Sequence, residues 1–335
     1  MKSLLFTGAA LFCLGGSLAT DYTQKRSLRV EISSNMEMEL KSMSMERDGQ
    51  PVEMPTMSMN STSKRTIAFV DTTLEHEDGA PKKVRRVFES LANESTTSFG
   101  ERQMESAMKP RLEGVTLELT RGDDGVEVKV VEGEAEGDAL EGHQLALLLD
   151  SFLPKGDEKE WELDNAAIQR GLALDVQKAL FAPPEQPEGG GEEGGRRRGP
   201  RGGSQVSGVL SMATLEGQAS LAEEPVDHGG VACKAIKLEI KGSGDLPMPE
   251  GRGPREGRFF DPAPPIVLVG NTYDIELEGQ LLFDPNTKLP VLLKLEGSIE
   301  IQQSSERTFN DSTMKQEMTM GGELEFEVEI TKSED

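Results

Sequence analysis

The feature that most constrains this chain is the strict alternation of apolar and polar residues over long stretches. The first stretch runs from Leu28 to Leu40, where the even positions are mostly aliphatic and the odd positions are charged or polar. Side chains of a β-strand alternate between the two faces of a sheet, so this period of two predicts a long strand with one apolar face. Shorter stretches of the same kind follow at residues 64–74, 84–91 and 112–120.

The C-terminal part of the chain carries three more alternating runs. They span residues 273–283, 291–301 and 314–330, and an Asp-Pro-Asn-Thr turn at 284–287 separates the first two. Because all three runs have one aliphatic and one acidic face, they predict a three-stranded antiparallel meander with a single apolar side. The stretches 213–221 and 231–240 predict a further strand pair before it.

The spacing changes from strand to helix in the middle of the chain. Between Asp138 and Phe181 the leucines and their apolar neighbours recur at helical intervals, which predicts two helices broken around Pro154. Strands of about a dozen residues are long for a small sandwich. The predicted fold class is therefore mainly β (α+β): a long curved antiparallel sheet or half-barrel, either continuous or in two β halves, with the central helical segment packed on its apolar face.

The N-terminus resembles a secretory leader. Lys2 precedes an apolar stretch that ends in the small-x-small tripeptide Ser17-Leu18-Ala19. This pattern predicts a signal peptide at residues 1–19, cleaved after Ala19, and an exported protein of the periplasm or extracellular space. Lipidation at Cys13 is the alternative, although Phe12 is bulky where a lipoprotein signal needs a small residue.

The remainder divides into three predicted parts. Residues 20–182 form a β-rich region followed by the helices at about 138–181, and residues 205–332 form an antiparallel β region. Residues 183–204 between them are rich in Gly, Pro, Glu and Arg without an apolar face, and this composition predicts a disordered linker. No segment after the leader approaches the roughly 20 apolar residues of a membrane-spanning helix, so we expect a chain that does not span the membrane.

Charge and composition argue against several classes of function. The formal net charge is −24 and aromatic residues make up 4% of the chain, so neither an electrostatic nor a stacking surface for nucleic acid is expected. The histidines His76, His143 and His228 are scattered and have no ligand or triad spacing. No phosphate-binding loop is present either. We therefore expect no catalytic residues, no cofactor and no enzymatic activity.

The tripeptide Leu-Glu-Gly recurs along the chain. The copies begin at Leu112, Leu140, Leu215, Leu277 and Leu295. Two of them, at Leu112 and Leu277, open comparable strand-turn-strand segments, which hints at two related β halves.

Methionine is the one unusual enrichment. Six residues of the N-terminal region form Met-x-Met pairs: Met36, Met38, Met43, Met45, Met57 and Met59. Thioethers are soft ligands that select Cu(I), so these residues are candidates for a copper site. The competing interpretation is that several of them simply continue the apolar face of a strand and fill a core.

The segment from Tyr273 to Phe326, with its long strands joined by Phe283-Asp284-Pro285-Asn286-Thr287, resembles uncharacterised exported bacterial proteins thought to be open β half-barrels akin to periplasmic lipoprotein carriers. This resemblance implies a concave sheet whose apolar face is covered by helices or by a lipid-like guest. The residues expected to line such a cavity are Leu277, Leu281, Leu293, Ile299, Met318 and Phe326.

Three functions are consistent with these patterns. The first is a non-catalytic exported protein that binds or carries an apolar, lipid-like ligand, which requires a cavity beside the helices. The second is a structural or interaction protein of the cell envelope with a filled core. The third is a copper(I)-binding protein that uses the methionines.

Overall fold

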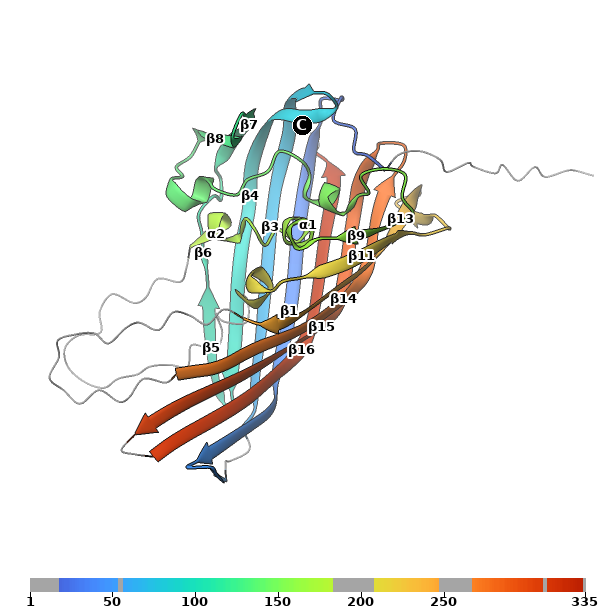
Figure 1. The fold of residues 1–335 in the computed structure, drawn as a ribbon. Coiled ribbons are helices and arrows are strands. Elements are labelled where there is room, and N and C mark those ends of the chain that lie inside the picture. The colour runs from blue at the N-terminus through green and yellow to red at the C-terminus, as the bar shows by residue number, and fades with distance from the viewer. Residues whose placement is uncertain (1–17, 54–56, 183–207, 247–266, 310–311, 334–335) are drawn as a thin grey trace, which may run out of the picture.

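The computed structural model describes residues 18–53, 57–182, 208–246, 267–309 and 312–333. Most of the expected signal peptide and the whole expected linker at 183–204 lie outside the described residues. The fold is mainly β, as the alternation predicts, and one large antiparallel sheet dominates it (Figure 1).

Six long strands form the centre of this sheet. They are β1 (Ser27–Arg47), β3 (Met59–Glu77), β4 (Ala80–Phe99), β14 (Val267–Asp284), β15 (Leu289–Phe309) and β16 (Ser312–Lys332). The longest have 21 residues, which corresponds to roughly 70 Å at the usual rise of a strand. Smaller strands extend the sheet on both sides: β7 (Thr116–Gly122), β8 (Gly125–Glu132), β9 (Glu160–Leu163), β11 (Glu216–Leu221) and β13 (Val231–Asp245).

The strand order is β8-β7-β4-β3-β1-β16-β15-β14-β13-β11-β9, and within the described residues the sheet is open rather than closed. β1 pairs with β16, so the first and last long strands meet at its centre. The pairing of β14 with β15 and of β15 with β16 confirms the predicted C-terminal meander. Short strands flank this path: β2 (Gln50–Pro51), β5 (Arg102–Ala107) and β12 (Val226–His228), with β6 (Lys109–Pro110) and β10 (Phe181–Ala182) forming a separate pair.

A bulge lets β1 keep one apolar face beyond the predicted strand. The register with β16 shifts between Leu40 and Ser42, so the inward side changes from even to odd positions. Met43 and Met45 consequently continue on the side of Met36 and Met38, and they are half-buried. A β-bulge adds one residue to a strand, which is why the alternation breaks at Lys41 although the strand does not.

Glycines allow neighbouring strands to approach closely on the inward face. A Cβ atom added at Gly297 would lie 1.9 Å from the carbonyl oxygen of Glu276, and one added at Gly279 would lie 1.9 Å from that of Lys294. Both glycines end Leu-Glu-Gly copies, as does Gly217, where the added Cβ would lie 2.9 Å from the oxygen of Glu239. The copies at Leu112 and Leu140 end instead in glycines with positive φ. The glycine of the tripeptide thus permits either a close approach between strands or a backbone conformation with positive φ.

Replacing Gly297 with alanine is expected to lower the unfolding free energy by about 1–3 kcal/mol, because the strands must separate to admit the methyl group. Gly270, on β14, is the matched control: its nearest atom would be 3.8 Å from an added Cβ. Gly270→Ala should change stability by less than about 1 kcal/mol. Urea denaturation of both variants measures the contrast, and equal effects would show that strand approach at Gly297 is not tight.

The central helical region is more irregular than its periodicity predicts. Instead of two helices, the structure has two 3₁₀ turns, η1 (Gly137–Leu140) and η2 (Leu148–Phe152), and two short helices, α1 (Asn165–Gly171) and α2 (Gln177–Leu180). Asp164 caps α1, its carboxylate accepting from the amide of Ala167. Gly171 lies against the ring of Phe152, whose Cε2 would be 2.1 Å from an added Cβ. Short turns that pack tightly against one another therefore stand where two longer helices are expected.

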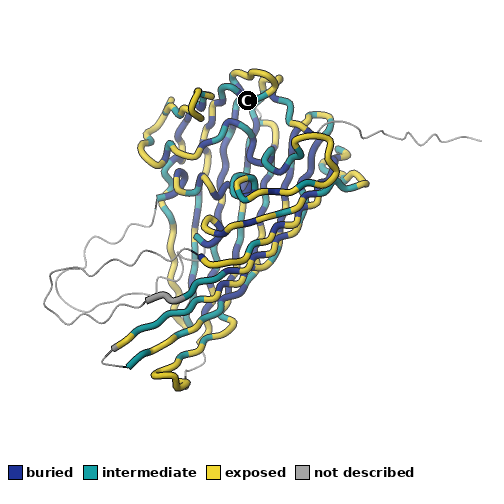
Figure 2. The backbone as a smooth tube through the Cα atoms, in the orientation of Figure 1, coloured by how far each residue is buried: buried dark blue, intermediate teal, exposed yellow. Residues whose placement is uncertain are grey.

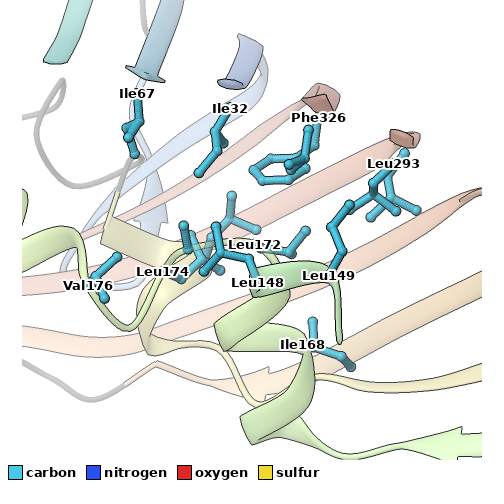
Figure 3. Packing of buried hydrophobic residues seen from close by; sticks show 14 of the residues in the cluster. Ile32, Ile67, Leu148, Leu149, Ile168, Leu172, Leu174, Val176, Leu293 and Phe326 are labelled. Carbon is cyan, nitrogen blue, oxygen red and sulfur yellow. The ribbon is translucent and has the colours of Figure 1, made fainter. Parts of the chain in front are cut away.

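Residues 137–182 and 208–215, here called the cover segment, contribute to the same core as the sheet. Figure 3 shows side chains of β1, β3, β15 and β16 directed toward cover residues such as Leu148, Leu172 and Val176, all of which are buried. In Figure 1 the cover segment crosses one end of the long strands, while their other ends extend beyond it. Burial follows this division, since the extended ends are mostly half-buried or exposed (Figure 2).

Candidate functional site

Five of the six expected cavity residues lie buried on the inward face of the C-terminal meander. Leu277, Leu281, Leu293, Ile299 and Phe326 are at most 5% exposed. Leu281 is directly opposite Leu293 in the sheet. Met318 is half-buried and lies eight residues from Phe326 along β16, or about 26 Å at the usual strand rise. The structure thus buries five of these residues in one core, and Met318 packs against the edge of the same core as a partly buried side chain.

Two small cavities lie among the described residues between the sheet and the cover segment. One cavity of about 30 Å³ lies there, and of the expected six residues only Leu277 and Phe326 line it. A second, of about 10 Å³, lies beside Ile32 and Phe88. Pockets for drug-sized ligands measure about 300–1,000 Å³. A lipid-sized guest therefore requires displacement of the cover segment.

Arg65 extends from β3 into this interior and contacts the cover segment. Its Nη2 donates to the carbonyl of Leu172 at 3.0 Å and its Nη1 to that of Ala173 at 3.3 Å, and its guanidinium lies 5.8 Å from the ring centre of Phe326. The side chain is buried, and this burial lowers the pKa of Arg65 from 12.5 to about 10. Arg65 thus remains a cation at neutral pH, and no described carboxylate pairs with it.

The 30 Å³ cavity has one polar and one apolar side. Arg65 Nε and Gln177 Oε1 are buried without a hydrogen-bond partner in the described structure, and both residues line this cavity. The remaining polar lining residues are Ser34, Ser63 and Asn93; the apolar ones are Met36, Leu172, Leu174, Leu210, Leu277, Leu324 and Phe326. A small amphipathic site therefore exists at the boundary between sheet and cover segment.

A few side chains fasten residues 208–215 of the cover segment. Gln169 Nε2 donates to the carbonyls of Leu210 at 3.0 Å and Ala213 at 3.2 Å. Tyr273 Oη accepts from the amide of Thr214 at 2.8 Å and donates to its carbonyl at 3.1 Å. This part of the cover segment is held by side chain–main chain bonds, whereas main-chain ladders hold the sheet together.

The residues before β1 tie down the other part of the cover segment. Thr20 Oγ1 donates to Asp150 at 2.5 Å, Tyr22 Oη donates to the same carboxylate, and the amide of Leu147 donates to Tyr22 Oη at 2.7 Å. Burial raises the pKa of Asp150 from 3.8 to about 6. Leu18, which lies within the expected leader, is 5% exposed and belongs to the hydrophobic core.

A buried ion pair lies beside these contacts. Arg86 donates from Nε and Nη2 to both carboxylate oxygens of Asp71, at 2.7 and 2.6 Å, and Nη2 also donates to the carbonyl of Gln144 at 3.2 Å. His143 is nearby, and burial together with the charge of Arg86 lowers the pKa of this histidine from 6.5 to about 4. Arg86, unlike Arg65, therefore has a carboxylate partner.

The candidate copper ligands are spread along the sheet. Met36, Met38 and Met59 are buried on its inward side, and Met43 and Met45 are half-buried beyond the bulge. Met57 precedes β3 and is 48% exposed, so it lies apart from the core methionines. β16 adds methionines, with Met318 directly opposite Met43. Most of these side chains continue an apolar face, as the core-filling interpretation expects.

The outward face of the sheet holds a groove of about 1010 Å³ with charged walls. Glu239, Glu278, Glu296 and Glu325 stand directly opposite one another on β13, β14, β15 and β16. Like charges in this position are destabilising. Such walls do not suit an apolar ligand, so the inward face is the better candidate site.

Within the described ranges, no group of three or more His, Cys, Asp or Glu side chains is placed to hold a metal ion. None of the helices described is both long and apolar enough to cross a membrane. No protein-family model matches the sequence, and no curated protein matches it.

The sequence interpretation missed Arg65, Asp71 and Arg86, although a signal for them exists. The inward register of β3 runs through Arg65, Ile67, Phe69 and Asp71, so two of its charged residues occupy positions where the apolar face is expected. Charged residues are rarely buried without partners. A charge on the apolar side of an alternating strand is therefore a usable marker of an internal polar site.

Proposed function

We propose that this is an exported, non-catalytic protein that binds or carries an apolar ligand between the sheet and the cover segment. The observation that carries the proposal is the interface itself. A continuous aliphatic face on long strands is closed by short turns and helices that depend on side chains such as Gln169, Tyr273 and Arg65. Displacing these turns and helices, while β9 stays paired with β11, exposes an apolar surface and leaves the long strands paired.

The expected resemblance to lipoprotein-carrier half-barrels is part of this proposal. An open sheet whose inward face is apolar is the architecture that such a carrier requires, and the described sheet is open. The 30 Å³ cavity at the boundary supports a ligand site there, because it already separates the two layers at this point.

The filled core favours one alternative, a structural or interaction protein of the envelope. The cavities of about 30 and 10 Å³ are the specific observation, because an interior this well packed is already stable without a guest. The two functions differ in what happens when the cover segment is loosened. A carrier gains access to a binding site, whereas a structural protein only loses stability.

Loosening the cover segment is expected to speed the binding of a neutral apolar dye such as Nile red. Gln169→Ala removes two hydrogen bonds to residues 208–215 and should raise the association rate by about tenfold, given roughly 0.5–1.5 kcal/mol for each bond. Gln280→Ala on β14 is the control. Stopped-flow fluorescence measures the rates. Failure of both variants and the parent protein to bind the dye saturably would favour the structural alternative.

A further inference from the structure

We propose that the ligand is an amphiphile with an anionic head group, and that Arg65 binds this head group while the aliphatic face of the sheet holds the chain. This inference rests on the proposed function and specifies its ligand class. It starts from a contrast between two buried arginines on neighbouring strands, Arg65 on β3 and Arg86 on β4, which are 6% and 4% exposed.

Arg86 has the partner that a buried cation normally needs. Both of its hydrogen bonds to Asp71 are shorter than 2.8 Å, and they form a bidentate pair. Arg65 has only the carbonyls of Leu172 and Ala173, and its Nε has no partner in the described structure. Burying a charge without an opposite charge nearby costs free energy, and the packing of the core does not require a charge at this position.

The position of Arg65 relates this unpaired charge to a ligand. Both of its acceptors are cover carbonyls, so displacing that part of the cover segment removes them together. Covering the guanidinium with an apolar guest would then leave its charge desolvated and unpaired. A carboxylate or phosphate oxygen restores the missing charge and matches the planar donor arrangement of arginine.

The lining of the cavity fits the other end of such a ligand. Ser34, Ser63, Asn93 and Gln177 lie with Arg65 around the polar part. Leu277, Leu324 and Phe326 lead from the cavity onto the aliphatic face of the meander. A head group at Arg65 therefore places an attached acyl chain along this face.

The test compares two ligands with the same chain and different heads, oleate and oleyl alcohol, as competitors of Nile red at pH 8 and below their aggregation concentrations. We expect the parent protein to bind oleate about 10- to 100-fold more tightly, because a hydrogen-bonded charge contributes roughly 1.5–3 kcal/mol. Arg65→Gln should reduce the ratio to within about threefold, and Arg65→Lys, which keeps the charge but loses the planar donor arrangement, should give an intermediate ratio.

Lys64→Gln is the matched control, since Lys64 is the adjacent residue on β3 but is exposed on the outward face. Its ratio should equal that of the parent. The two ligands are compared within one variant, so a general loosening of the cover segment changes both affinities and cancels in their ratio. The comparison in the parent protein remains decisive even where an Arg65 variant fails to fold.

Three further competitors identify the source of the anion. Oleyl phosphate should compete like oleate, whereas acetate and inorganic phosphate, which lack a chain, should not compete at millimolar concentration. Competition by the small anions alone would contradict the proposal that the ligand is an amphiphile. Equal binding of oleate and oleyl alcohol by the parent protein would contradict an anionic head group but leave the proposed function intact. Binding of neither ligand would contradict both the head group and the proposed function.

Discussion

Arg86→Met should lower the unfolding free energy by about 3–5 kcal/mol, because it breaks a buried ion pair. The change leaves the carboxylate of Asp71 without its cation, and water cannot replace the cation because that side chain is only 7% exposed. It also removes the bond to the carbonyl of Gln144 in the cover segment. The loss of a packed guanidinium stem adds little, because methionine has a similar length.

A double variant separates the charge from the packing. Replacing Asp71 with leucine in the Arg86→Met background removes the unpaired carboxylate, so most of the lost stability should return. Arg85→Met is the matched control, since Arg85 is the preceding residue of β4 and is exposed. Urea denaturation at pH 7 gives the three free energies. A double variant as unstable as the single one would show that the ion pair is not the cause.

The sequence predicts the long strands well because their signal is local. Apolar or glycine positions alternate with polar or charged ones over residues 273–281 of β14, 293–301 of β15 and 323–330 of β16, so eight or nine consecutive positions agree on one period. The antiparallel pairing then follows from the short turn at 285–288. Topology beyond neighbouring strands does not follow in this way, and the central pairing of β1 with β16 joins residues about 300 positions apart.

The breaks in the pattern are less predictable because each depends on a partner elsewhere in the chain. The bulge at Lys41 is visible only when β16 supplies the register. Gly297 and Gly279 look like weak points in strands until the neighbouring carbonyls are placed against them. The cover segment has helical spacing, but its turns are fixed by contacts such as the ring of Phe152 against Gly171.

The candidate site divides in the same manner. Alternation identifies Leu277, Leu281, Leu293, Ile299 and Phe326 as one apolar face, and the structure buries all five. Alternation also includes Met318, but it does not say where along a 21-residue strand the cover segment ends. The alternation marks Arg65 as a charge on the apolar side of β3, but its two acceptor carbonyls lie more than 100 residues away, so no local pattern reveals its partners.

The second large effect concerns pH and two groups whose contributions oppose each other. Burial raises the pKa of Asp150 from 3.8 to about 6, so this residue stabilises the fold below pH 4 and loses that contribution as the pH rises through 6. The pKa of His143 falls from 6.5 to about 4, so this residue stabilises the fold above pH 6.5 and loses that contribution as the pH falls through 4. Each shift corresponds to roughly 3 kcal/mol.

Single substitutions should separate the two contributions between pH 4 and 6.5. In His143→Gln only Asp150 titrates of the two, so the unfolding free energy should fall by about 3 kcal/mol as the pH rises. In Asp150→Asn only His143 titrates, and the free energy should rise by about the same amount. The double variant supplies the background from the other ionisable groups. Both single variants following the double variant across this range would show that neither group is perturbed by its burial.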